Sequence, residues 1–253
     1  MAGAMSRTQI DCLGDRLRQG NITEADLRLL DEYRRTFTPA YEVIIGRIRK
    51  ELRLEPTGRP AKSTTSLSDK LRRESVRLTQ IQDIAGCRLI VADIAEQDRV
   101  VQSLVSLFEQ TTTVDRRQQP SHGYRAVHVI VRREGKLIEI QVRTALQHLW
   151  AELSEKFSDV ADPAIKYGGG DEGIQKALKA AYLDIARVES LETELADVQM
   201  RLSSQNKLTD DNKERIASAQ EALSSLKQKM LDDYSNIVKG LGEIKGETDG
   251  LPD

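Results

Sequence analysis

Cysteine and long apolar runs are scarce in this sequence of 253 residues. Its two cysteines, Cys12 and Cys87, supply neither a disulfide framework nor a cluster of metal ligands. No stretch approaches the ~18–20 consecutive apolar residues of a membrane-spanning helix, and none has the pattern of a signal peptide. We therefore expect a cytoplasmic protein that keeps its thiols reduced and has no membrane partner.

Charge, in contrast, is plentiful and unevenly distributed. Charged residues make up 31% of the chain, which is typical of long solvated helices beside a real core. Residues 1–150 carry 25 Lys/Arg against 19 Asp/Glu, a net charge of +6, whereas the remainder carries 13 against 21, a net charge of −8. The first part therefore suits an anionic ligand, and the second does not.

Strand-like and helix-like stretches alternate through the first two thirds of the chain. "CRLIVAD", "YRAVHVIVRR" and "KLIEIQVRT" have the apolar content or the alternation of strands, and helical patterns lie around them, including a short one near 67–77. This order predicts a mixed α/β (α+β) fold. We expect four parts: helices over 7–53 that pack on the core, the core over 54–170, a helical hairpin or coiled-coil arm over 171–240, and a flexible tail over 241–253.

The expected arm contains two narrow apolar stripes at helical spacing, separated by the polar break "SSQNK". The first includes Leu178, Ala181, Ile185 and Val188. Such stripes fit a cover packed on the chain's own domain, and they fit equally well a surface for a homo-oligomer or another partner. Both interpretations stay open.

A two-residue turn at Glu134–Gly135 would pair the last two strand-like stretches as a hairpin, because glycine accepts a positive φ there. One face of this hairpin is then a dry aliphatic layer of Val127, Val129, Val131, Ile138, Ile140 and Val142. The opposite face gathers an aromatic ring, an imidazole, a carboxylate, an amide and a guanidinium, from Tyr124, His128, Glu139, Gln141 and Arg143. These groups can stack on a base, hold a metal and meet phosphates, although a self-satisfied charged face has the same composition.

A second polar cluster lies in "GRPAKSTTSLSDK", where Arg59, Lys62 and Lys70 surround a run of Ser and Thr that includes Ser66. Cations, hydroxyls and free N–H groups at a helix start form the outline of a polyphosphate site, and a simple helix cap would look similar. The GxxxxGK[ST] pattern of a P-loop is absent.

A second carboxylate precedes the first buried strand. Asp83 and the cation Arg88 lie in "IQDIAGCRLIV". If Asp83 pairs across the sheet with Glu139, the two carboxylates make a plausible Mg²⁺ site, because this ion takes few carboxylates and completes its shell with phosphate oxygens and water.

Taken together and in order, "GRPAK", "QDIAGCR", "HGYRAVH" and "EIQVRT…W" resemble the RelA/SpoT-type alarmone synthetase domain, and the chain is most similar to a single-domain small alarmone synthetase. The resemblance covers about residues 40–155. It implies a nucleotidyltransferase-like mixed five-stranded sheet flanked by helices. It also implies a pyrophosphokinase that uses Mg²⁺ to move the β,γ-pyrophosphate of ATP to the ribose 3′-hydroxyl of GDP or GTP, making the (p)ppGpp alarmone of the stringent response.

The same resemblance assigns roles to individual residues. Asp83 and Glu139 would bind Mg²⁺, and Glu139 would also act near the acceptor hydroxyl. ATP would be held by Arg59, Lys62, Ser66, Lys70 and Arg88. The acceptor would be held by Tyr124, His128, Gln141, Arg143 and His148. The family's Arg-x-Lys spacing is one residue longer here, in Arg59-x-x-Lys62, and His148 stands where small synthetases often carry Asn.

Alternative functions differ mainly in the acceptor. "YRAVH", "QHLWA" and "KYGGG" resemble a toxic branch whose members pyrophosphorylate the 3′ end of tRNA, and an adenine nucleotide acceptor that yields (p)ppApp is a further alternative. A toxin would imply an antitoxin protein as partner. A non-catalytic nucleotide-binding module is disfavoured because Asp83, Glu139 and Tyr124 are all present.

Overall fold

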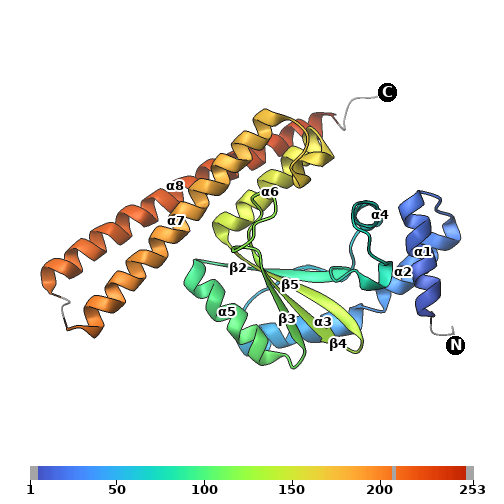
Figure 1. Cartoon of the computed structure of the whole chain (residues 1–253), viewed down its shortest axis with the longest axis horizontal. Helices are drawn as coiled ribbons and strands as arrows, with labels where there is room; N and C mark the ends of the chain where they lie inside the picture. The colour runs from blue at the N-terminus through green and yellow to red at the C-terminus, as the bar shows by residue number, and fades with distance from the viewer. Residues whose placement is uncertain (1–4, 207–208, 249–253) are drawn as a thin grey trace. The chain divides into compact units, whose positions relative to one another are not determined.

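The computed structural model describes residues 5–206 and 209–248, and the chain forms two compact units that are interleaved in sequence (Figure 1). The first unit contains residues up to Leu89, Val101–Val114 and His128–Val142. The second contains Ile90–Val100, Asp115–Val127 and the chain from Arg143 onward.

The N-terminal part of the first unit is helical, as the sequence predicts. α1 (Arg7–Gln19) and α2 (Glu24–Arg35) each begin with a capping box, at Ser6 and Thr23. α3 (Thr38–Arg47) continues into a π-helical turn over Ile48–Leu52. These helices bury a shared set of aliphatic side chains: Ile10, Leu13, Leu17, Leu30, Ile44, Ile45 and Ile48.

The five strands form one sheet in the order β1-β2-β5-β4-β3, so the predicted mixed five-stranded fold is correct. Their bounds are β1 (Thr57–Arg59), β2 (Ala85–Val91), β3 (Thr111–Asp115), β4 (Val127–Arg133) and β5 (Lys136–Thr144). The residue patterns alone did not identify β1 and β3. β1 is a three-residue strand inside a stretch rich in Gly and Pro, and the mostly polar β3 lies at the other edge of the sheet, so neither has the alternation of a half-buried strand.

The β4–β5 hairpin confirms the predicted turn and dry layer. Glu134 and Gly135 have φ values of 51° and 73°, the two positive values of a type I′ turn. All six predicted aliphatic residues of the layer are buried: Val127, Val129, Val131, Ile138, Ile140 and Val142. The first strand is shorter than predicted and begins at Val127, because a turn with positive φ at His122 and Gly123 ends in the isolated Ser121–Tyr124 bridge.

Two further helices follow strand-like or loop segments. α4 (Thr64–Arg73) begins and ends earlier than the predicted 67–77, because Ser63 caps it by accepting from the Ser66 N–H and Glu74 is already extended. α5 (Ile94–Leu107) follows β2.

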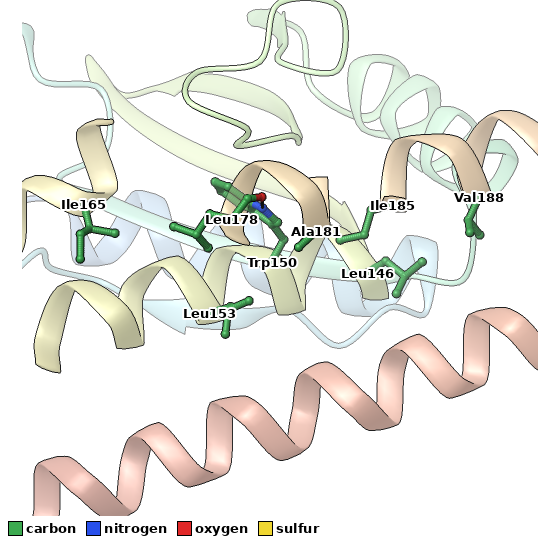
Figure 2. Packing of buried hydrophobic residues seen from close by; sticks show 8 residues of the cluster. All are labelled: Leu146, Trp150, Leu153, Ile165, Leu178, Ala181, Ile185 and Val188. Carbon is green, nitrogen blue, oxygen red and sulfur yellow. Dashed lines mark hydrogen bonds between the residues drawn. The ribbon is translucent and has the colours of Figure 1, made fainter. Parts of the chain in front are cut away.

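The second unit is built on α6 (Ala145–Val160), a 3₁₀ turn (Pro163–Tyr167), α7 (Glu172–Ser204) and α8 (Asp210–Thr248). α7 and α8 run side by side as a long hairpin (Figure 1). Figure 2 shows the apolar core that α6, the 3₁₀ turn and α7 share, made of Leu146, Trp150, Leu153, Ile165, Leu178, Ala181, Ile185 and Val188. The indole N–H of Trp150 also donates to the Leu178 carbonyl over 2.9 Å.

The stripe of α7 therefore serves as packing within its own unit over Leu178–Val188. Beyond that stretch the helix carries exposed apolar side chains, with Val198 46% and Met200 67% exposed. α8 continues to Thr248, past residue 240 where the sequence pattern ended the arm; Gly240, Gly242 and Gly246 lie in this stretch, but no proline interrupts it. The end of the predicted flexible tail, 249–253, lies outside the described residues. In the described parts of the chain, no helix is long and apolar enough to cross a bilayer.

Candidate active site

Asp83 is the centre of a charged cluster in the first unit. The ammonium groups of Lys62 and Lys70 donate to its two carboxylate oxygens over 2.5 and 2.9 Å. Lys62 lies in the loop after β1, and its backbone N–H donates to the Ile84 carbonyl. Lys70 lies on α4. Burial alone would raise the pKa of the Asp83 carboxyl, but the two ammonium groups outweigh burial and lower it. Asp83 is therefore ionised at neutral pH.

A second cluster of the same unit surrounds Glu139 on β5. One carboxylate oxygen lies 2.8 Å from Nδ1 of His128, and the other accepts from the Gln141 amide over 2.7 Å. Burial is the largest single influence on the pKa of Glu139 and acts to raise it, but the His128 ring and the Gln141 amide together outweigh burial and the pKa is lowered. The negative charge of Asp83 acts on Glu139 in the opposite direction, which places the two carboxylates within electrostatic reach of each other.

Gly86 allows β2 to lie close against Glu139. A Cβ atom at this position would stand 2.7 Å from the backbone carbonyl oxygen of Glu139. On the other side of β2, a Cβ at Gly58 would stand 2.5 Å from the Gly86 carbonyl oxygen. Two glycines are therefore required for β1, β2 and β5 to approach one another at the position of the carboxylates.

Asp83 and Glu139 fit a magnesium ion only if a ligand completes the shell. Both are ionised oxygen donors, which Mg²⁺ prefers, and two carboxylates plus substrate phosphates is an ordinary set for it. Within residues 5–206 and 209–248, no group of three His, Cys, Asp or Glu side chains is arranged to hold a metal by itself. The donor set thus suits an ion that arrives with a polyphosphate.

The remaining residues predicted to hold ATP lie on β1, β2 and the start of α4. Ser66 is in the first turn of α4, where its hydroxyl accepts from the cap residue Ser63 over 2.8 Å. Arg59 pairs with Gly86 in the β1–β2 register and Arg88 with Thr57; the side chain of Arg88 is partly buried, and that of Arg59 is outside the described part of the structure. The sequence analysis missed Arg34 of α2, which donates to the Thr64 hydroxyl at the start of α4 over 3.0 Å.

In the second unit, Tyr124 and Arg143 contact each other. The Arg143 guanidinium donates to the Tyr124 hydroxyl over 2.8 Å, and its Cζ lies 5.0 Å from the centre of the tyrosine ring. Arg143 is 4% exposed, so this cation is largely removed from water. Gly123 lies against Trp150, because a Cβ there would stand 2.7 Å from the indole ring. The predicted acceptor residues Tyr124 and Arg143 are thus one contact pair beside a packed turn.

His148 lies on α6, with Nε2 3.5 Å from the Glu152 carboxylate one turn later. The structure thus brings together Asp83 with its lysines, Glu139 with His128 and Gln141, and Tyr124 with Arg143. These groupings agree with what the motifs predict about proximity within each unit. The roles of the residues stay predictions.

The sequence analysis also missed a buried polar network around Glu189 of α7. Its carboxylate accepts from Arg125, Thr144 and Gln147. The signal that could have found it is a glutamate directly beside Val188 and four residues after Ile185, on the apolar stripe of a helix.

A profile of the region found in RelA / SpoT proteins matches residues 58–158, which contain every site residue named above from the predicted set. The GTP pyrophosphokinase YwaC of Bacillus subtilis is 32% identical over 149 residues, covering 52% of this chain and 70% of that protein. The chain therefore belongs to the RelA/SpoT family.

Two further similarities define how far the match extends. An uncharacterised protein of Mycobacterium tuberculosis is 41% identical over 128 residues, which are 49% of this chain and 46% of that protein, so the chain spans about half the length of this relative. The crystal structure of small alarmone synthetase 1 from Bacillus subtilis has a TM-score of 0.50 at 24% identity, over 70% of this chain and all of that one. The latter likeness concerns the fold.

Proposed function

We propose that the chain is a Mg²⁺-dependent pyrophosphokinase that transfers the β,γ-pyrophosphate of ATP to the ribose 3′-hydroxyl of GDP or GTP. The observation that carries the proposal is the pair of ionised carboxylates, Asp83 and Glu139, one of them held by two lysines. The name of YwaC, a GTP pyrophosphokinase, supports the reaction class.

Each cluster has a part in this reaction. The ammonium groups of Lys62 and Lys70 would bind the ATP phosphates, and the N-terminal turn of α4 with Ser66 adds N–H and hydroxyl donors. Asp83 and Glu139 would hold Mg²⁺, which when bound neutralises charge on the transferred group. Arg59 and Arg88 would flank the adenine.

The transfer begins when the acceptor's 3′-hydroxyl oxygen attacks the β-phosphorus of ATP. The bond from that phosphorus to the oxygen bridging it to the α-phosphorus breaks, and AMP leaves with the electron pair. The hydroxyl proton passes to Glu139, which is ionised and is oriented by His128 and Gln141. For the acceptor, the ring of Tyr124 would stack on the base, Arg143 and Gln141 would bind phosphate and ribose, and His148 would read the base.

The test is incubation with ATP labelled at the γ-phosphate, with GDP, GTP, ADP, ATP or deacylated tRNA supplied separately, and with or without Mg²⁺. We expect labelled product and equimolar AMP with GDP and GTP, and none without the metal. Labelled tRNA or a labelled adenine nucleotide as the main product would move the acceptor to that class. Release of label only as free phosphate or pyrophosphate would refute the pyrophosphokinase.

A further inference from the structure

Glu189 is a charged side chain in an apolar position. It lies on the stripe of α7 beside Val188 and is 3% exposed. Burial raises the pKa of its carboxyl, while Arg125 and the other donors act to lower it. A buried carboxylate is a poor way to stabilise a helix, since an apolar side chain of similar size would pack there at lower cost. Its contacts therefore call for an explanation beyond packing.

The contacts of Glu189 lead to two particular segments of the chain. Arg125 donates to one carboxylate oxygen over 2.9 Å. The other oxygen accepts from the Thr144 hydroxyl and from the Gln147 amide, each over 2.8 Å. Thr144 is at the same time the N-cap of α6.

Arg125 directly follows Tyr124 in the chain, and Thr144 directly follows Arg143. Tyr124 and Arg143 are the contact pair joined by a 2.8 Å hydrogen bond and a ring–guanidinium contact. One carboxylate thus holds the chain neighbours of both partners. A displacement of either neighbour would shift the geometry of the pair.

The segment that carries Tyr124 needs such a support. His122 and Gly123 both have positive φ, at 52° and 92°, a backbone region that is uncommon for residues other than glycine. Two backbone hydrogen bonds hold the segment. The Tyr124 N–H donates to the Ser121 carbonyl, and the Arg116 N–H donates to the Ala126 carbonyl. The ion pair of Arg125 with Glu189 fixes it to α7 as well.

We infer that Glu189 is a positioning residue for the acceptor site, acting through Arg125 and Thr144 on the Tyr124–Arg143 pair. This inference rests on the proposed function, in which that pair binds the acceptor. It gives the helical arm a part in acceptor binding without any arm residue contacting the nucleotide.

The decisive comparison is Glu189→Gln against Glu192→Gln, made in the full chain. Glu192 lies on the same helix one turn later and pairs with Lys227 of α8 over 2.6 Å, so its change breaks an ion pair within the arm that is not bonded to Arg125 or Thr144. We expect Glu189→Gln to raise the KM for the acceptor about tenfold, the factor that loss of a charge-assisted hydrogen bond gives. The KM for ATP and kcat at saturating acceptor should stay unchanged, and Glu192→Gln should change none of the three.

A second readout does not depend on activity. Hydrogen–deuterium exchange of peptides covering 120–127 should be faster in Glu189→Gln than in the wild type and in Glu192→Gln. Arg125→Gln should reproduce both effects from the other side of the ion pair, which covers the case in which Glu189→Gln does not fold.

The inference is overturned if exchange over 120–127 is the same in Glu189→Gln and Glu192→Gln, or if the KM values for ATP and acceptor rise together. A wild type that transfers pyrophosphate to no acceptor would instead refute the proposed function. The exchange measurement would then still decide whether Glu189 orders the Tyr124 segment.

Discussion

Asp83 in the first unit and Glu189 in the second are both carboxylates with little exposure and with basic partners, yet their pKa values shift in opposite directions. Two ammonium groups outweigh burial at Asp83 and lower its pKa. At Glu189 burial outweighs one guanidinium and neutral donors from Thr144 and Gln147, and the pKa is raised. The first site is built to keep a charge, and the second tolerates one at a cost.

The kind of partner explains the difference in use. Lysine is a compact charge on a flexible stem, so in the proposed reaction Lys62 and Lys70 would turn from Asp83 to an arriving polyphosphate and leave the carboxylate for a metal. Arg125 presents a planar fork, and the hydroxyl of Thr144 is fixed by its role as a helix cap. Exchangeable partners suit chemistry, whereas fixed partners suit positioning.

The largest effect that would test this comparison is expected from Asp83→Asn. The change keeps the shape but removes the charge, and we expect kcat for pyrophosphate transfer to fall about a thousandfold, the upper range for losing one electrostatic contact to the reacting groups. Asp69→Asn is the control, since Asp69 lies on α4 but is half exposed and pairs with Arg72. Near wild-type transfer by Asp83→Asn, measured with labelled ATP, would remove the metal assignment.

The second largest effect is expected at the Tyr124–Arg143 pair in the second unit. Tyr124→Ala should raise the KM for the acceptor by about 10- to 100-fold, because stacking of a base on an aromatic ring is worth ~1–3 kcal/mol. The KM for ATP should not change. Tyr124→Phe keeps the ring and loses only the hydrogen bond from Arg143, so its effect should be smaller. Weaker ATP binding with intact acceptor binding would show that the two pockets are assigned the wrong way round.

Sequence reasoning succeeded where a feature depends on near neighbours in the chain. The Glu134–Gly135 turn and the alternation of Ile138, Ile140 and Val142 are local, and from them the grouping of Glu139 with His128 and Gln141 follows. The five-stranded sheet came from the family resemblance, since three-residue β1 has no pattern of its own.

The Glu189 network could not be predicted in the same way. Glu189 and Arg125 are 64 residues apart, and their contact depends on how α7 packs against α6. A glutamate on an apolar stripe indicates a buried partner but not which one. Similarly, the longer Arg59-x-x-Lys62 spacing does not by itself determine where the lysine side chain lies. In the structure, Lys62 donates to Asp83.

A smaller effect is expected from His148→Asn, which concerns choice among acceptor bases. Stacking on Tyr124 tolerates any base, so selectivity must come from hydrogen bonds, and an amide offers a donor and an acceptor in place of the imidazole. We expect the ratio of kcat/KM for GDP over ADP to rise severalfold, and less than about tenfold, as one hydrogen bond allows. Glu152→Gln is the control, because it alters the neighbour of His148 and leaves the ring. An unchanged ratio would remove His148 as the base reader.

The smallest effect is a pair of opposite pH dependences, and it tests the comparison most directly. Because the folded pKa of Asp83 is below its ordinary 3.8, the stability that its charge contributes is present above that value and is lost as pH falls through the folded pKa. Because the folded pKa of Glu189 is above its ordinary 4.5, its contribution is present below that value and is lost as pH rises through the folded pKa. The excess stability of the wild type over Asp83→Asn should therefore grow with pH, and its excess over Glu189→Gln should shrink.

Urea unfolding of the wild type and the two variants from about pH 3 to about pH 7 measures how each difference in unfolding free energy changes with pH. Each difference should change by about 1 kcal/mol for each unit of pKa shift. Glu192→Gln serves again as the control, since a change in the arm's ion pair with Lys227 should not reproduce the slope of Glu189→Gln. Slopes of the same sign for Asp83→Asn and Glu189→Gln would contradict the distinction between the two carboxylates. They would mean that Arg125, Thr144 and Gln147 keep Glu189 ionised as firmly as the two lysines keep Asp83, and the positioning network would then stabilise the fold as well as hold the acceptor pair.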